Sequence, residues 1–208
     1  MYKELINGAF VPQDISYPTL MKKHVKKHSS YLQPIFEAIS NSLEATSGKD
    51  DIITIRINKA KTLNQEQYSF LSIDIIDTGI GFNDDNFARL RRLYDESKGQ
   101  NNFGTGRVQY LHFFNNTDIY SVFEEEGLKY KRRIVLSKNF YATQKSVIWS
   151  SEKEVVDIDT PIGTMVSFYY PLSDEDKEKY NELTTTELRD RILIHYLSRF
   201  CLNRDNLQ

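Results

Sequence analysis

Cysteine is almost absent from this sequence of 208 residues, and other absences are equally informative. A single cysteine, Cys201, cannot form a disulfide framework or a zinc site built from cysteines. No apolar run approaches the ~20 residues that a membrane-spanning helix needs. The first ten residues, MYKELINGAF, also lack the pattern of a signal peptide. These absences predict a soluble, cytoplasmic protein that has no membrane partner.

An excess of charge of one sign is also missing. Lysine and arginine number 27 against 29 for aspartate and glutamate, so the net charge is −2. A protein that depends on non-specific binding to nucleic acid usually shows a basic excess, and this one does not. Hydrophobic residues make up 39% and aromatic residues 12%, which is enough for a folded core. We expect one domain over residues 1–208, with residues 1–28 as an N-terminal extension.

Apolar periodicity predicts the order of the secondary structure. Helices are expected at residues 31–46, 84–94, 108–114 and 184–201, and strands at 51–57, 70–77, 118–123, 128–137, 145–150 and 164–170. Ser29 or Ser30 is expected to cap the first helix and Asp84 or Asp85 the second, while a capping box at Thr184 opens the last. This order is not a repeated βαβ unit. It predicts an α/β fold, a two-layer α/β sandwich whose mixed β-sheet is covered by helices on one face.

The first helix carries two polar residues one turn apart, Glu37 and Asn41. Taken alone, they are most simply the solvent-facing stripe of an amphipathic helix. They also have complementary chemistry, since a carboxylate can orient and deprotonate a water. A carboxamide oxygen is a neutral ligand that suits magnesium. One turn apart, the two side chains could hold a water and a metal beside the same phosphate group.

A second motif, Asp77-Thr-Gly-Ile-Gly81, directly follows an expected strand. Aspartate and glycine are common turn residues, so a turn is one interpretation. The alternative is a ligand site, in which Asp77 accepts a hydrogen bond from an exocyclic amine. Gly79 and Gly81 would then leave the backbone open to a flat base.

Two further glycine motifs follow along the chain. A Gly-rich segment from Lys98 to Gly106 leads into a helix, whose N-terminus would present N–H groups to phosphate. It is neither a P-loop nor a dinucleotide-binding fingerprint, and a surface loop is the alternative interpretation. Gly163-Thr164 opens a late strand and carries little information by itself.

The order and spacing of the four motifs resemble the GHKL ATPase superfamily. This group includes gyrase-type topoisomerase subunits, heat-shock chaperone ATPases, MutL mismatch-repair proteins, MORC proteins and histidine kinases. The resemblance covers residues 20–170, with FEAISNSLEA (residues 36–45) similar to the first family box and IDIIDTGIG (residues 73–81) similar to the second. It implies the Bergerat ATP-binding fold, with ATP and Mg²⁺ as cofactors.

The resemblance also implies roles for the residues of the first two motifs. Glu37 would be the catalytic base for the attacking water, and Asn41 would coordinate the magnesium ion that bridges the phosphates. Asp77 would bind the adenine amino group, with Gly79 and Gly81 beside the base.

For the later motifs, the resemblance implies an ATP lid at residues 95–107. The lid would contact the phosphates through Lys98, Gly104, Thr105 and Gly106, and Thr164 would join the water network around Asp77. Arg107 stands where relatives usually carry other residues, and it is expected to contact phosphate or to form a salt bridge.

Glu37 favours the hydrolysing branch of the superfamily, because histidine kinases lack this helix glutamate. Within that branch the resemblance is to MORC, MutL and heat-shock chaperone ATPase domains. Such relatives usually continue into a second domain, so we expect this chain to be the N-terminal part of a longer protein. Homodimerisation on ATP binding, and a DNA or protein client, are implied as well. Three alternatives stay open: a nucleotide-binding switch without catalysis, a histidine-kinase-like catalytic domain and a protein-interaction scaffold.

Overall fold

The structure is a computed structural model that describes residues 30–46, 51–61, 68–91, 106–144 and 146–202. Within these ranges the chain forms seven strands and six α-helices, with one 3-10 turn at Lys138–Phe140. The strands are β1 (Ile53–Lys61), β2 (Tyr68–Asp77), β3 (Phe114–Glu125), β4 (Leu128–Ser137), β5 (Ile148–Ser150), β6 (Glu154–Val155) and β7 (Gly163–Pro171). The helices are α2 (Gln33–Ala45), α3 (Asp84–Arg91), α4 (Gly106–Phe113), α5 (Tyr141–Gln144), α6 (Asp174–Glu182) and α7 (Thr185–Leu202).

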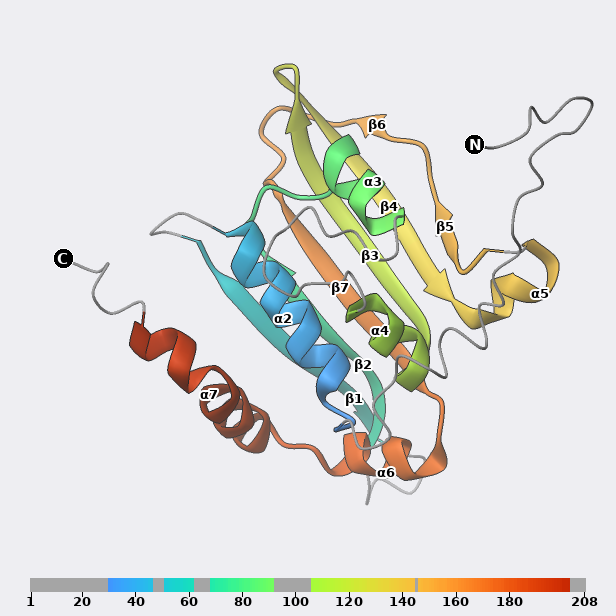
Figure 1. The fold of residues 1–208 in the computed structure, drawn as a ribbon, viewed down its shortest axis with the longest axis vertical. Coiled ribbons are helices and arrows are strands. Elements are labelled where there is room, and N and C mark those ends of the chain that lie inside the picture. Colours follow the sequence, from blue (N-terminus) through green and yellow to red (C-terminus); the bar gives the residue numbers. More distant parts are fainter. Residues whose placement is uncertain (1–29, 47–50, 62–67, 92–105, 145, 203–208) are drawn as a thin grey trace, which may run out of the picture.

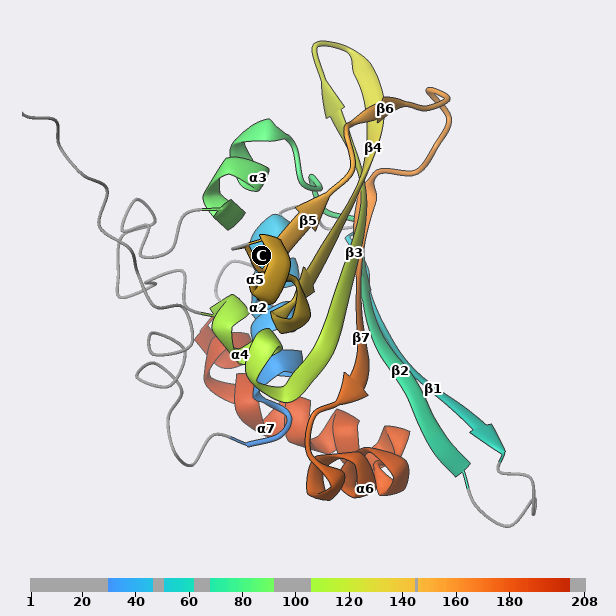
Figure 2. The ribbon, with the colours of Figure 1, turned by 90° about the vertical axis from the view of Figure 1, so that its right-hand side faces the viewer.

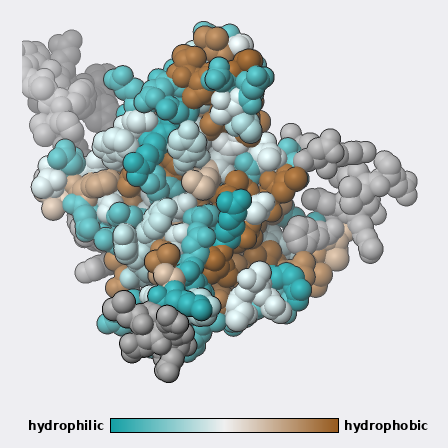
Figure 3. Space-filling model, turned by 180° about the vertical axis from the view of Figure 1, so that it is seen from behind, coloured by the Kyte–Doolittle hydropathy of each residue, from teal (hydrophilic) through white to brown (hydrophobic). Residues whose placement is uncertain are grey.

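The molecule has two layers, a twisted sheet and a layer of helices (Figure 1). The sheet has the order β1-β2-β7-β3-β4-β5, with β6 paired to β4. Helices α2, α3, α4 and α7 lie on one face, as the side view shows (Figure 2). Among the described elements none covers the opposite face, on which hydrophilic and hydrophobic patches are interspersed (Figure 3). The predicted two-layer α/β sandwich, covered on one face, is confirmed.

The sheet differs from the prediction in one respect, because every described strand pair is antiparallel rather than mixed. β1 and β2 are sequence neighbours that pair directly, as are β3 and β4. β7 then inserts between β2 and β3 and runs antiparallel to both. A crossover helix between parallel strands is therefore not needed in this part of the chain.

Helix α2 forms where the sequence predicts it. Pro34 lies in its first turn, and the buried apolar side chains include Ile35, Phe36 and Ile39. The expected serine cap is not the residue at the N-cap position, which is Leu32. The hydroxyl of Ser30 instead accepts a hydrogen bond from the Leu32 N–H at 3.2 Å, just before the helix begins.

The later elements follow local rules that are visible in the sequence. Strands β3 and β4 are joined by Glu126 and Gly127, both with positive φ (51° and 77°), as a type I′ hairpin turn requires. The hydroxyl of Thr184 accepts from the Glu187 N–H at 3.1 Å and caps α7 as predicted. At α3 the capping side chain is Asn83, whose Oδ1 accepts from the Asn86 N–H at 2.9 Å, rather than Asp84 or Asp85.

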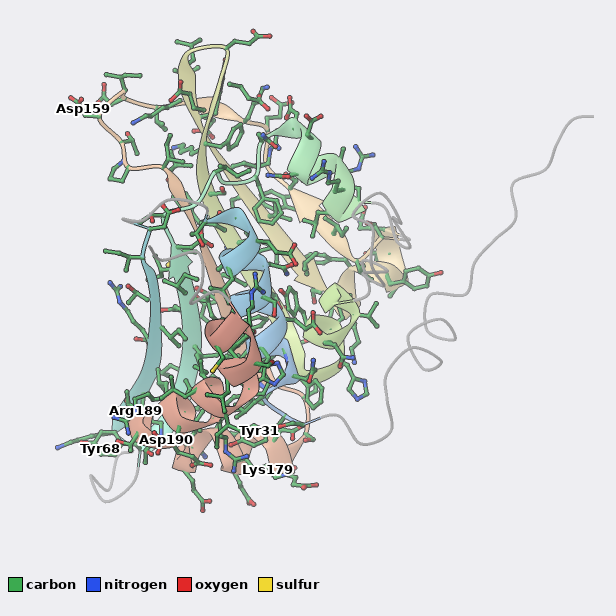
Figure 4. All side chains as sticks on the ribbon, turned by 60° about the vertical axis from the view of Figure 1, so that its left-hand side comes forward. Tyr31, Tyr68, Asp159, Lys179, Arg189 and Asp190 are labelled. Carbon is green, nitrogen blue, oxygen red and sulfur yellow. The ribbon has the colours of Figure 1, made fainter. Side chains whose placement is uncertain are left out.

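Helix α6 packs against the aromatic side chains of the core through one residue. Its one buried residue, Tyr180, stacks on Phe70 at 4.8 Å between ring centroids and donates a hydrogen bond to the carbonyl of Tyr31. Figure 4 shows Tyr31 beside Lys179, whose ammonium lies 5.7 Å from the Tyr31 ring centroid. These two contacts of Tyr31 join α6 to the segment just before α2.

A search of the described helices for a membrane-spanning segment, one with enough length and apolar character, found none.

Candidate functional site

The candidate site lies where β2 ends beneath the C-terminal part of α2. Asp77, the last residue of β2, is directly opposite Thr164 in β7, and Thr164 is directly opposite Ser121 in β3. The strand register therefore places three polar side chains in one row across three neighbouring strands. All three are buried on the face that the helices cover. We call this row, together with Ser42 and Gly79, the Asp77 site.

The carboxyl group of Asp77 is only 5% exposed and is held by hydrogen bonds. Oδ2 accepts from the Ser42 hydroxyl at 2.7 Å, and Oδ1 accepts from the Gly79 N–H at 3.0 Å. Burial raises the pKa of this carboxyl group above its ordinary value, and hydrogen bonds from Ser42, Gly79 and the Thr164 backbone oppose the rise. The site thus holds an acidic group whose ionised form is costly.

A hydrogen-bond network extends from Asp77 across the sheet. The hydroxyls of Thr164 and Ser121 lie 3.1 Å apart, and the Ser121 hydroxyl accepts from the Phe82 N–H at 2.9 Å. Through Phe82, this network attaches the segment after β2 to β3, which is separated from β2 in the sheet by β7. It leaves Asp77 in a defined orientation at the end of its strand.

The glycines around Asp77 are required by the fold itself. A Cβ at Gly79 would lie 2.8 Å from atoms of Ala45, and one at Gly81 would lie 2.5 Å from the Val122 carbonyl oxygen. At Gly163 it would lie 2.1 Å from the Asp77 carbonyl oxygen. Packing therefore accounts for these glycines without a ligand. The prediction that Gly79 and Gly81 flank a base stays a prediction.

Glu37 and Asn41 are both on α2, one turn apart. The Nδ2 group of Asn41 donates to the Tyr110 hydroxyl on α4 at 3.0 Å, and Oε1 of Glu37 accepts from Gln33 Nε2 at 3.0 Å. Glu37 is half-buried and Asn41 is exposed. Tyr110 occupies the nitrogen of the Asn41 amide, and among the described residues none forms a hydrogen bond with the Asn41 amide oxygen. That oxygen is the atom that a magnesium ion would need, so Asn41 fits the role.

The structure does not describe all of the predicted site. Lys98, Gly104 and Thr105 lie outside the described residues, with most of the expected lid. Gly106 and Arg107 form the first turn of α4, whose Tyr110 contacts Asn41. Within the described ranges no group of three or more His, Cys, Asp or Glu side chains could hold a metal ion. Magnesium usually keeps several water ligands and binds substrate phosphates, so a site at Asn41 would not require such a group.

Sequence reasoning missed three residues of this region, Ser42, Ser121 and Tyr110. Two of them carry a signal in the sequence. Ser42 occupies a core-facing position of α2 that an apolar residue would normally fill, and Ser121 does the same in β3. A buried serine usually has a hydrogen-bond partner, so such a position indicates a polar network. Tyr110 has no comparable signal.

Neither the comparison with models of known protein families nor the search of curated proteins found a match to this chain. The resemblance to the GHKL superfamily therefore rests on the motif residues themselves.

Proposed function

We propose that this chain is a magnesium-dependent ATP-binding and ATP-hydrolysing module. The observation that supports it most is the buried carboxyl group of Asp77, held at a strand end beneath the helix that carries Glu37 and Asn41. Burial of an ionisable group at this depth costs stability, and such groups gather at functional sites. In this proposal adenine lies at Asp77 and the phosphates lie along α2.

Asp77 has the hydrogen-bonding capacity that adenine recognition needs. A carboxylate offers about four acceptor positions, and the hydrogen bonds from Ser42, Gly79 and the Thr164 backbone use three of them. One acceptor position is left for the exocyclic amine of adenine. Since the groups that hold Asp77 are themselves buried, it is oriented before a ligand arrives.

Glu37 is the proposed general base of the hydrolysis. Its carboxylate would take a proton from the attacking water as the bond to the γ-phosphorus forms, and ADP leaves. The hydrogen bond from Gln33 orients this carboxylate on the half-buried face of α2. Asn41 would hold the magnesium ion, which supplies charge neutralisation at the phosphates when bound.

The experiment is a comparison of Glu37→Ala with the parent for phosphate release and for binding of Mg-ATP. We expect phosphate release to fall at least about a hundredfold, in line with the loss of a general base, while the affinity for Mg-ATP stays within a few-fold. Glu178→Ala, at an exposed position on α6, is the control and should match the parent.

The outcomes separate the alternatives. Parental phosphate release by Glu37→Ala would remove the base assignment. A parent that binds Mg-ATP without releasing phosphate would instead support a nucleotide-binding switch. Homodimerisation on ATP binding, a DNA or protein client and a cytoplasmic location are implied by the resemblance and the composition, and they stay predictions.

A further inference from the structure

Arg132 is a charged side chain buried in the helix-covered face of the sheet. It lies on β4, and the residue is 5% exposed. Arginine is almost never buried at this depth unless it is paired, because an unpaired guanidinium group would lose its hydration. Its neighbours on β4 differ sharply, since Lys131 and Arg133 have side chains that are 38% and 55% exposed. Arg132 alone of these three side chains is buried.

Four groups surround the Arg132 guanidinium. Its carbon lies 4.5 Å from the ring centroid of Phe87 on α3 and 5.1 Å from that of Phe123 on β3. Nη1 donates to the Phe82 carbonyl at 3.1 Å, and Nη2 pairs with Asp84 at the start of α3. One side chain therefore binds the segment after β2 and the first residue of α3 at the same time.

No residue of α3 is fully buried, and its Phe87 and Leu90 side chains are partly buried against the core, so the Arg132 contacts add a polar attachment to this apolar packing. Asp84 also pairs with Lys153 at 2.7 Å, and Lys153 pairs with Glu125 at 2.6 Å. These outer groups are more exposed than Arg132 and contribute less to stability. Arg132 is thus the most buried of the four side chains that form these ion pairs.

The same guanidinium is connected to Asp77 by continuous hydrogen bonds. The carbonyl of Phe82 accepts from Arg132 Nη1, and the N–H of the same residue donates to the Ser121 hydroxyl. Ser121 is bonded to Thr164, and the Thr164 backbone is bonded to Asp77. Each link is between buried or half-buried groups, so water does not compete strongly for them.

We infer that Arg132 is a positioning residue for the Asp77 site. It fixes the segment of Phe82, and through Ser121 and Thr164 it holds the surroundings of the Asp77 carboxyl group. The consequence for nucleotide selection rests on the proposed function, in which Asp77 binds the adenine amine. Loss of Arg132 loosens that acceptor and weakens discrimination between ATP and GTP, whose ring presents a carbonyl oxygen at the same position.

The test uses Arg132→Met, which keeps an unbranched chain between the two aromatic rings but removes both polar contacts. Arg132→Lys keeps the charge but lacks the fork that contacts Phe82 and Asp84 together, and it replaces the first variant if that one does not fold. The control is Lys131→Met, the neighbouring position on β4, whose side chain pairs with Glu154 at 2.9 Å.

The first readout is amide hydrogen exchange at Phe82 and Gly79 in the nucleotide-free protein. Exchange at both should quicken by about tenfold in Arg132→Met, the effect of losing hydrogen bonds to a charged group, and Lys131→Met should match the parent. The second readout is the ratio of the affinities for Mg-ATP and Mg-GTP. It should fall by about tenfold in the same variant.

Unchanged exchange at Phe82 and Gly79 in a folded Arg132 variant would overturn the positioning role, whatever the nucleotide result. If exchange is faster but the ratio of the affinities for Mg-ATP and Mg-GTP is unchanged, Arg132 stabilises the local structure only, and the effect on nucleotide selection is overturned. If exchange is faster in Arg132→Met but the parent protein binds neither ATP nor GTP, the positioning role is supported and the proposed function is rejected. The two claims can therefore fail separately.

Discussion

At the scale of the residue, the central feature is a carboxyl group that the fold buries at a cost. Asp77 is 5% exposed, and its hydrogen bonds do not fully offset the loss of hydration, since its pKa is raised. The folded protein consequently binds the Asp77 proton more tightly than the unfolded chain does. From the ordinary value of 3.8 up to the raised folded pKa, this group makes stability fall as pH rises.

Asp77→Asn removes that penalty while keeping an acceptor for the Gly79 N–H. We expect its stability relative to the parent to be greatest at pH 7, where the parent carboxyl group carries its largest penalty. The advantage should shrink as pH is lowered towards 4, because the parent then becomes protonated. Urea unfolding of both proteins at several pH values measures this. A stability difference that does not change with pH would contradict the buried-carboxyl account.

A side chain at Gly163 would clash with the backbone of Asp77 in the neighbouring strand. Its φ is +153°, and a Cβ would lie 2.1 Å from the Asp77 carbonyl oxygen. We expect Gly163→Ala to lose more than about 3 kcal/mol of unfolding free energy, since strain and a backbone clash add. Gly127→Ala, with a positive φ but open space around it, should lose only about 1–2 kcal/mol. Equal losses at the two glycines in chemical denaturation would reject the clash.

At the scale of the element, α7 contacts α2 through two neighbouring residues, His195 and Tyr196. The Tyr196 hydroxyl donates to the Phe36 carbonyl and is 2.8 Å from the Ser40 hydroxyl, while the His195 ring stacks on Phe36 at 4.0 Å. Tyr196→Phe should therefore lose about 1 kcal/mol, the net contribution of a buried hydrogen bond.

The matched control is Tyr68→Phe, at a tyrosine that is 53% exposed. It should change the free energy of unfolding by less than about 0.5 kcal/mol. If the two variants lose the same amount in urea unfolding, the Tyr196 hydroxyl does not fasten α7 to α2.

Elements with a strong apolar period could be predicted from the sequence, and α2 and α7 are examples. Helix α6 could not, because its sequence DEDKEKYNE has a single apolar side chain that becomes buried, Tyr180. Its position depends on the aromatic contacts of that residue with Phe70 and Phe114. These neighbours are about 110 and 66 positions away in the sequence, so local pattern does not contain them.

The candidate site was predicted in its charged residues but not in their supports. Asp77 stands out because a carboxylate at a strand end before Gly-x-Gly is chemically suggestive, and Glu37 and Asn41 because their spacing is helical. Ser121 is a different case, since only the antiparallel register of β3, β7 and β2 brings it into line with Thr164 and Asp77. A mixed sheet, as expected from the sequence, would not specify that row.

At the scale of the whole molecule, the sandwich brings the site together from four separate segments. α2 contributes Glu37, Asn41 and Ser42, β2 contributes Asp77, and β3 and β7 contribute Ser121 and Thr164. The described helices lie on one face of the sheet (Figure 2), and Asp77 is buried on that face. The proposed binding of a nucleotide at this site would consequently depend on the folded molecule as a whole, since no single motif carries all of these residues.

The most direct test of this account is a calorimetric titration of Mg-ATP into the parent protein and into Asp77→Asn. We predict saturable binding of one ATP per chain by the parent. Binding by Asp77→Asn should be weakened by at least about tenfold, because a buried acceptor for the adenine amine is lost. An absence of binding by the parent, or equal affinity in the two proteins, would contradict the central claim that Asp77 recognises ATP.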